Sequence, residues 1–550
     1  MSPGWARHTR SPRAGSPPVR TIGRVGYSYQ RVCPSPQGAA TAAPHPDLNV
    51  PSLRSRPLLC TLLGTPILET PSPDPAMLLS HLLLPISAAH VAGADLRVGR
   101  VTDRDEEVGA GDVFVAIRGA HVDGHDRVAA LAHAGAVVVE HKVQAPKGVT
   151  VVTVSDTRAA LPILAARRLD DPGAAMAVIA ITGTNGKTST TYLIEAMAVA
   201  AGWKVGIIGT TGHFIDGVAR PASHTTPSAP VIQGLLAEMR DAGCKIVAME
   251  TSSIGLAARR CDAIPFRAAI FTNLTRDHLD YHGTMDAYAA AKARLFHECL
   301  AGTAVLNARD PASAQMVPEN HPTWWFGGRD IDVDGLVLSA TGAVGHFRTP
   351  SGEFDGRLQL LGAHSVENAL GALGGALAVG VPLDACAAGM ANLRCVPGRL
   401  EPVPNGRGIT VLVDYAHTDD ALTRVLASLR ALHPRRILTV FGCGGDRDRG
   451  KRPLMGRASA RGSDLSIVTT DNPRSEDPAT IAADILNGVG AAPHFVELDR
   501  ARAISRAIAL AEPGDIVLIA GKGHEATMEK DGVKVAFDDR VVAAEALGAA

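Results

Sequence analysis

The sequence has few aromatic residues and no excess of charge of either sign. Phe, Trp and Tyr make up 4% of the 550 residues, and 54 basic residues stand against 55 acidic ones. This balance gives no global polycation of the kind that binds nucleic acid, and there is no acidic tail. The chain instead contains 46% hydrophobic residues and 56 glycines, which is typical of helices packed on parallel sheets.

Metal-binding cysteine spacings and long apolar runs are also missing. The eight cysteines form no CxxC pair, so we expect small buried thiols in a reducing compartment. No run of about 18 apolar residues lacks charges, which predicts a soluble, cytoplasmic protein without a membrane span. At about 150 residues per domain, the length suggests three or four domains.

Residues 1–76 differ from everything after them. They are rich in Pro, Ser and Arg, with only Asp47, Glu69 and Asp74 as acids, and they lack the apolar surface to fold alone. A disordered extension, a transit peptide and a start codon assigned too early are all open, and we favour the first or the last. Met77 opens a plausible alternative N-terminus, and we assign no function to the segment.

The stretch around Lys187 carries the strongest chemical signal. Residues 177–182 are an apolar run that predicts a buried strand, and residues 183–186 form a glycine turn. A helix is expected from Thr188, with an apolar face made by Leu193, Ile194, Met197 and Val199. This order aims backbone N–H groups at phosphate, with the lysine reaching the β- and γ-phosphates and Thr188 binding Mg²⁺.

The spacing differs from the ordinary P-loop, which requires glycine where Ile181 stands. A strand-to-helix turn without a ligand is the alternative interpretation. Because Lys, Thr and Ser follow Gly186 directly, we favour ATP binding.

Three α/β regions are expected, at residues 77–176, 177–395 and 396–550. In the first, strands at 112–118 and 136–140 flank a helix at 128–134, and residues 123–125 (Asp-Gly-His) either bind a small polar ligand or form an ordinary loop.

In the second region, strands are expected at 204–208, 246–250 and 268–271, and a helix ends at Ala242. Lys187, Glu250 and His278 follow strand ends, so they should converge at one edge of the sheet. Glu250 is a hard ligand suited to Mg²⁺, and His278 is either a ligand or a hydrogen-bonded loop histidine. From the residues alone, Lys292 is predicted to be a surface lysine on a helix.

In the third region, strands at 409–413, 437–441, 465–469 and 516–520 alternate with helices. Arg447 and Arg474 follow strand ends and can grip carboxylates. Asp471 and Glu525 can receive an ammonium group, so the four together suit a zwitterion. Structural ion pairs are the alternative for any one of them.

Six segments together resemble the Mur ligases of peptidoglycan assembly, and most closely their MurE branch: residues 183–188, 249–253, 277–282, 414–417, 441–448 and 471–474. The last two are the most specific, and the others are shared with sister ligases and folylpolyglutamate synthase. The resemblance covers about residues 90–545. It implies an α/β fold with an N-terminal domain for the UDP end of the substrate, a central P-loop-type ATPase domain and a C-terminal Rossmann-like domain for the incoming amino acid.

The resemblance also implies a reaction. ATP phosphorylates the terminal carboxylate of UDP-MurNAc-L-Ala-D-Glu, and the amine of the third amino acid then displaces phosphate. The cofactors would be ATP and Mg²⁺, and the protein would act as a monomer on small molecules, without nucleic acid or membrane. An arginine at position 474 implies meso-diaminopimelate, whose extra carboxylate needs a cation.

The resemblance assigns residues by position. Lys187, Glu250, His278 and Lys292 would be catalytic. Thr188, Glu250, His278 and Lys292, the last as a carbamate, would hold the metal. ATP would contact Gly183, Thr184, Asn185, Gly186, Lys187, Thr188, Ser189, Asn307, Arg399 and Asp414. The muramyl dipeptide would contact Thr225, Thr226, Ser252 and Arg260. Diaminopimelate would contact Arg447, Asp471, Asn472, Pro473, Arg474, Gly521 and Glu525.

Several positions depart from the family pattern. Residues 104–106 (Arg-Asp-Glu) stand where the family has its Asp-Ser-Arg uridine motif, so no uridine contacts are assigned. The other departures are Ile254 for His, Ala258 for Gln, Ser365 for Asn and Asp419 for Pro.

Two competing interpretations follow. A lysine-adding ligase or a folylpolyglutamate synthase is disfavoured by Arg447 and Arg474. A non-catalytic relative, like the structural plastid proteins of transcription complexes, is disfavoured by the intact Lys187 and Lys292.

Overall fold

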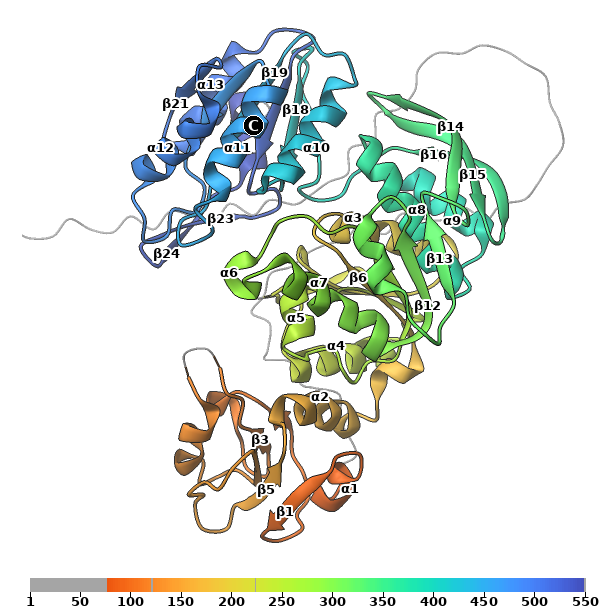
Figure 1. Ribbon diagram of the computed structural model, residues 1–550, viewed down its shortest axis with the longest axis vertical. Helices are drawn as coiled ribbons and strands as arrows, with labels where there is room; N and C mark the ends of the chain where they lie inside the picture. The colour runs from red at the N-terminus through yellow and green to blue at the C-terminus, as the bar shows by residue number, and fades with distance from the viewer. Residues whose placement is uncertain (1–76, 120–121, 223, 549–550) are drawn as a thin grey trace, which may run out of the picture. The chain divides into compact units, whose positions relative to one another are not determined.

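The computed structural model describes residues 77–119, 122–222 and 224–548, so our expectations for residues 1–76 lie outside it. Figure 1 shows strands and helices alternating along the chain, which confirms the expected α/β class. None of the described helices is long and apolar enough to cross a membrane. Of the six cysteines among the described residues, five are buried and Cys395 is exposed.

The first sheet has five strands in the order β1-β5-β4-β3-β2, with only β1 antiparallel to its neighbour. Its strands are β1 (Ala88–Ala92), β2 (Val101–Thr102), β3 (Val113–Val115), β4 (Ala136–Val139) and β5 (Thr150–Val154). Helices α1 (Leu79–Leu83) and α2 (Thr157–Arg168) pack on it. The short 3₁₀ helix η1 (Asp105–Glu107) connects β2 to β3, and η3 (Pro172–Ala175) leads from α2 to the second sheet.

The prediction of a helix at residues 128–134 is wrong. The segment forms the 3₁₀ helix η2 (Gly124–Ala130) instead, because a 3₁₀ helix rises about 2 Å per residue and spans the connection between β3 and β4 with few residues. Within the same loop, His125 is buried, with Nδ1 2.6 Å from Asp123 and Nε2 accepting from the backbone N–H of Glu140 at 3.0 Å. Both ring nitrogens hold the loop together, which favours the ordinary-loop interpretation of residues 123–125.

The second sheet has eight strands in the order β13-β12-β11-β6-β10-β7-β8-β9, all parallel from β13 to β7. Its strands are β6 (Ala177–Thr182), β7 (Val205–Gly209), β8 (Gly212–Ile215), β9 (Val218–Arg220), β10 (Ile246–Glu250), β11 (Phe266–Phe271), β12 (Leu300–Asn307) and β13 (Thr323–Phe326). The expected strands at 177–182 and 246–250 are confirmed residue for residue.

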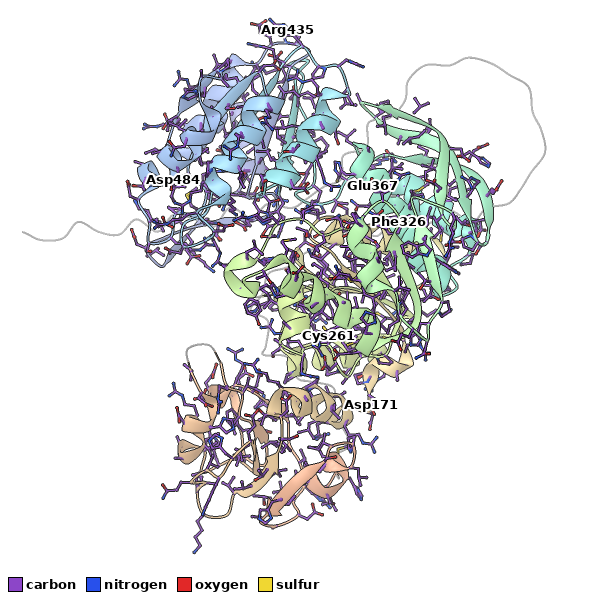
Figure 2. All side chains as sticks on the ribbon, in the orientation of Figure 1. Asp171, Cys261, Phe326, Glu367, Arg435 and Asp484 are labelled. Carbon is purple, nitrogen blue, oxygen red and sulfur yellow. The ribbon has the colours of Figure 1, made fainter. Side chains whose placement is uncertain are left out.

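Successive side chains of these strands point to opposite faces, and each face has its own hydrophobic cluster. Ile179 and Ile181 face α3 (Lys187–Ala200), α8 (Ala363–Ala378) and α9 (Leu383–Asn392). Val178 and Ala180 belong to the cluster of α4 (Ala229–Asp241). Figure 2 marks Phe326 and Cys261, one from each cluster.

Val199 does not belong to the apolar face of α3, contrary to expectation, and is 57% exposed. It follows Met197 by two residues, and residues two apart do not share a helix face.

The remaining elements of this region carry loops and one added sheet. They are α5 (Ser253–Ala257), α6 (Leu279–His282), α7 (Met285–Arg294), the π-helical turn η4 (Leu295–Cys299) and η5 (Pro311–Met316). An antiparallel meander of β14 (Asp332–Ser339), β15 (Gly342–Thr349) and β16 (Gly352–Leu358) follows. It joins the α8 and α9 cluster through Ala343, Phe347 and Leu358.

The third sheet has six strands in the order β17-β18-β22-β19-β20-β21, with only the edge strand β17 antiparallel. Its strands are β17 (Glu401–Val403), β18 (Thr410–Asp414), β19 (Ile437–Phe441), β20 (Leu465–Val468), β21 (His494–Val496) and β22 (Ile516–Ala520). Helices α10 (Asp419–Arg430), α11 (Lys451–Gly462) and α12 (Pro478–Val489) cover one face, and α13 (Arg500–Leu510) and α14 (Asp539–Ala546) cover the other. The hairpin of β23 (Thr527–Lys530) and β24 (Val533–Ala536) lies beyond β22.

Candidate functional site

A cavity of about 380 Å³ lies at the carboxyl ends of β6 and β10. The turn 183–186, the start of α3, Glu250, His278 and Lys292 line it, as do Arg399 and Asp414 from beyond residue 395. The expected convergence of Lys187, Glu250 and His278 is therefore present, because parallel strands end at one edge of their sheet.

The turn before α3 is shaped around its two glycines. Gly183 has φ +143° and Gly186 has φ +90°, and a Cβ at these positions would lie 1.9 Å from Thr272 Oγ1 and 2.2 Å from Asn368 Oδ1. No other residue type fits there. The turn thus brings backbone N–H groups to the cavity wall, which is how phosphate is held at the start of a helix.

The side chain of Lys187 folds back over this turn. Its Nζ donates to the carbonyl oxygens of Gly183 and Thr184, each at 2.9 Å. Burial lowers its pKa, while Glu250 and Asp277 oppose that shift. A half-buried ammonium held by carbonyl oxygens stays available to an anion, which fits a phosphate-binding role.

Glu250 is 1% exposed and is held by one threonine. Its Oε1 accepts from the N–H of Thr210 at 3.0 Å, and its Oε2 accepts from the Thr210 hydroxyl at 2.8 Å. Thr210 follows strand β7 directly, and that position was the only sequence signal for it. It also contacts Thr225, with 2.9 Å between the hydroxyl oxygens.

The other three residues expected to contact a muramyl dipeptide lie together. The Thr226 hydroxyl donates to the Glu250 carbonyl at 2.8 Å and accepts from the N–H of Ser252 at 3.0 Å. Arg260 Nη1 donates to the carbonyl of Thr226 at 2.7 Å. The four predicted residues therefore form one polar group beside the carboxylate.

Lys292 is 1% exposed, so the prediction of a surface lysine is wrong. Its Nζ lies 4.5 Å from the centre of the Tyr288 ring, one helical turn earlier on α7. Burial, together with the charge of Lys187, lowers its pKa well below the ordinary lysine value. Because the helix around it is rich in alanine, the sequence shows no alternation of apolar and polar residues from which to predict its buried face.

His278 has φ +53° and lies beside Asp277, with 3.6 Å between His278 Nε2 and the Asp277 carboxylate. Burial lowers the pKa of His278, and the charge of Asp277 opposes the shift. The lowered pKa favours the neutral imidazole, the form that can coordinate a metal.

The donors in the cavity limit which divalent metal it can hold. Within the described ranges, no cluster of three His, Cys, Asp or Glu side chains is arranged to hold a metal. The cavity does offer the Glu250 carboxylate and the Thr188 hydroxyl. This sparse oxygen set fits Mg²⁺, which keeps several waters and binds phosphate oxygens, and it does not fit a metal that needs a full protein cage.

Most of the remaining residues expected to bind ATP lie at the cavity. Thr184, Asn185 and Ser189 line the cavity, and Arg399 Nη2 donates to the Thr188 hydroxyl at 3.0 Å.

Asn307 is not among the lining residues. Its Nδ2 donates to the Thr272 carbonyl at 2.7 Å, and its Oδ1 accepts from the N–H of Arg309 at 2.9 Å. The side-chain amide is thus engaged within the fold.

Asp414 is buried and accepts from the N–H groups of Leu400 and Ala416, each at 2.7 Å. Burial raises the pKa of its carboxyl, and the charge of Arg399 opposes that shift. The carboxylate holds the turn that carries Arg399.

The residues expected to contact the amino acid gather at the carboxyl ends of β19, β20 and β22. A Cβ at Gly444 would lie 3.0 Å from Arg474 Nη1 and 3.9 Å from Arg447 Cγ, so both arginines flank this glycine. Arg474 has φ +51° and donates to the Gly445 carbonyl at 2.7 Å. Pro473 precedes it and presses its carbonyl against Gly445, where an added Cβ would lie 1.9 Å from the Pro473 oxygen.

The acidic members lie in the neighbouring loops. Asp471 is 8% exposed, and a Cβ at Gly521 would lie 2.7 Å from its Oδ2. Burial alone would raise its pKa, but the charges of Arg500, Lys522 and Lys451, with the N–H of Asn472, together lower it. Asn472 Nδ2 donates to Glu525 Oε2 at 2.9 Å. The two arginines and the two carboxylates thus lie in neighbouring loops at one sheet edge, an arrangement that suits a zwitterion.

Comparison with known proteins matches most of the chain. Residues 82–170 match the model described as "Mur ligase family, catalytic domain", residues 181–376 the Mur ligase middle domain, and residues 398–523 the "Mur ligase, glutamate ligase domain". A protein of Geobacter metallireducens named UDP-N-acetylmuramoyl-L-alanyl-D-glutamate–2,6-diaminopimelate ligase is 42% identical over 464 residues, 79% of this chain and 91% of that protein. A protein of the same name from Gloeobacter violaceus is 42% identical, over 86% of this chain and 98% of its own length.

Solved structures agree in fold. A structure of a protein with the same ligase name has a TM-score of 0.60 and 34% identity, and the match covers 82% of this chain and 94% of that one. MurF of Thermotoga maritima, solved with ADP, is 20% identical with a TM-score of 0.57, over 82% of this chain and 96% of its own. The second similarity concerns the fold alone.

Proposed function

Because this chain belongs to the Mur ligase family, we propose that it is the ATP-dependent ligase that adds meso-diaminopimelate to UDP-MurNAc-L-Ala-D-Glu during peptidoglycan precursor synthesis. The observation that carries the choice of amino acid is the pair Arg447 and Arg474 flanking Gly444. Two arginine side chains from neighbouring loops at this glycine suit a substrate with two carboxylates. L-Lysine has only one carboxylate.

The phosphate loop performs the first part of the reaction. The N–H groups of residues 183–188 and the ammonium of Lys187 bind the phosphates of ATP and offset the charge of the transferring phosphoryl group. Asn307 supports this loop indirectly. Its side-chain amide donates to the carbonyl oxygen of Thr272, and the Thr272 hydroxyl donates to the carbonyl oxygen of Asn185 at 2.6 Å. Arg399 and Asp414 make the remaining contacts with the nucleotide.

Thr188, Glu250, His278 and a carbamate on Lys292 are the residues we propose to hold Mg²⁺. When bound, the ion polarises the phosphoryl oxygens and neutralises their charge. The low pKa of Lys292 supports the carbamate, because only an unprotonated amine adds CO₂.

The substrates then meet between the two groups of side chains. Thr225, Thr226, Ser252 and Arg260 bind the dipeptide, so that its terminal carboxylate takes the γ-phosphoryl group. Arg447 and Arg474 hold the carboxylates of diaminopimelate, and Asp471 and Glu525 hold its ammonium group. The free amine forms the C–N bond as the C–O bond to phosphate breaks, and the amine's proton leaves to solvent.

We further propose that residues 77–176, 177–395 and 396–550 are domains for the UDP end, ATP and the amino acid, since each range has its own sheet and hydrophobic cluster. The protein would act as a monomer on small molecules in the cytoplasm, where ATP is available.

The test is phosphate release by the purified protein with ATP, Mg²⁺ and UDP-MurNAc-L-Ala-D-Glu, adding meso-diaminopimelate or L-lysine in turn. Turnover with diaminopimelate alone is the expected result. Turnover with lysine alone would keep the ligase and refute the role given to Arg474. A folded protein without turnover on either amino acid would refute the proposed function.

A further inference from the structure

Lys522 is a fully buried lysine for which the proposed reaction has no role. It lies in the loop after β22, between Gly521 and Gly523, and its side chain is 0% exposed. A buried ammonium is costly unless it is paired and hydrogen-bonded. Its partners therefore indicate why the loop carries a cation there.

Those partners are two residues of the amino-acid site. Lys522 Nζ donates to Asn472 Oδ1 at 3.1 Å and to Glu525 Oε2 at 3.0 Å. The same Glu525 oxygen accepts from Asn472 Nδ2 at 2.9 Å. The three side chains form a closed triangle, in which each member contacts both of the others.

The triangle fixes the direction of the Asn472 amide. Its Oδ1 accepts a second bond, from the backbone N–H of Glu529 on β23 at 3.0 Å. Because two donors hold the oxygen, the NH₂ group must point to Glu525. A flipped amide would face the ammonium with its own donors, so Lys522 selects one orientation.

The triangle also leaves half of the Glu525 carboxylate free. Both bonds end on Oε2, and among the described residues no hydrogen bond is made to Oε1. The Glu525 side chain is 33% exposed, whereas that of Lys522 is 0% exposed. The carboxylate is therefore anchored through one oxygen on a partly exposed side chain, and its other oxygen is left for a substrate ammonium.

We propose that Lys522 is a positioning residue of the amino-acid site: it holds Glu525 and Asn472 in the orientation that receives the ammonium group of the incoming amino acid. This inference rests on the proposed function. Lys522 does not touch the substrate and acts through Glu525.

The test compares Lys522→Met, Glu525→Gln and the double variant with the wild-type enzyme, under saturating ATP and UDP-MurNAc-L-Ala-D-Glu. Methionine keeps the length of the side chain and removes its charge. We expect Lys522→Met to raise KM for diaminopimelate about tenfold or more, as for a lost charged hydrogen bond, with KM for ATP unchanged and kcat within about threefold. Lys534→Met, on the exposed strand β24, is the matched control and should behave as wild type.

The double variant separates positioning from mere structural support. If Lys522 acts through Glu525, the double variant should have the KM of Glu525→Gln alone, because coupled residues are not additive. Fully additive effects, an unchanged KM in Lys522→Met, or a fall in kcat without a change in KM would each overturn the inference. A folded wild-type protein without amino-acid-dependent phosphate release would instead overturn the proposed function, and with it the substrate named here.

Discussion

The amine of Lys292 lies 4.5 Å from the centre of the Tyr288 ring, and each of these residues is 1% exposed. No carboxylate is paired with this amine in the salt bridges of the described residues. A lysine in such a place lowers stability when charged, since its desolvation is not repaid. Its presence beside the phosphate loop therefore indicates a role in the reaction and not in stabilising the fold.

We predict that Lys292→Met abolishes catalysis without destabilising the fold. Removing a buried amine relieves its desolvation cost, so the midpoint of thermal unfolding should stay level or rise. Losing the proposed metal ligand should lower kcat about 100-fold or more, as when one electrostatic stabiliser is lost. Lys204→Met, at an exposed lysine, is the control. A variant that unfolds, or that keeps full activity, would contradict the role.

Lys187→Met should abolish ATP-dependent phosphate release while the protein remains folded. Its ammonium is held by two carbonyls of its own turn, so the fold loses little when it is removed. The transferring phosphoryl group, however, loses its nearest cation, which costs on the order of 100-fold or more in kcat. Phosphate release and circular dichroism measured on one preparation check this. If Lys187→Met kept its turnover, the phosphates of ATP would have to bind elsewhere.

Gly183→Ala should destabilise the protein much more than Gly217→Ala. Both glycines have positive φ, +143° and +79°, but a Cβ at Gly183 meets Thr272 Oγ1 at 1.9 Å, whereas nothing lies within 4 Å of one at Gly217. The second change thus measures backbone strain alone, about 1 kcal/mol. The first adds a steric clash, for an expected total of at least about 3 kcal/mol. Chemical denaturation of the two variants gives the difference, and equal losses would contradict the crowding argument.

The sequence predicted the features that depend on local order. Strands β6 and β10 were predicted correctly because each is a short apolar run bounded by turns, and the glycine turn follows from its spacing. Glu250 and His278 were expected to converge with Lys187 because they follow strand ends. That expectation needs only a parallel sheet, which the apolar runs already indicate.

Other features depend on partners distant in the chain. Lys292 looks like a surface residue because α7 is rich in alanine, and only the fold places it at the cavity. Asn307 matches a motif, yet its amide contacts Thr272, which is 35 residues away. Lys522 and Asn472 are 50 residues apart and meet only because β20 and β22 end at the same edge of the sheet. No periodicity of the sequence encodes such contacts.

The stability of the protein should fall as the pH decreases from about 6.5 to 4. His364 is held near Ser428, with 3.1 Å between Nδ1 and the hydroxyl, and burial, with a smaller contribution from Arg424, lowers its pKa from 6.5 to about 4. Between these values the unfolded chain binds a proton that the folded chain does not. Stability is therefore complete above pH 6.5 and decreases as the pH falls to 4.

The loss attributable to His364 should be on the order of 3 kcal/mol, since each unit of pKa shift corresponds to about 1.4 kcal/mol. Urea unfolding at several pH values should show this slope in the wild-type protein and a smaller slope in His364→Gln, which cannot bind the proton. The slope of the variant should not vanish, because burial also lowers the pKa of His524 to about 4. If the variant and the wild type had the same slope, the ring of His364 would not be the group that titrates.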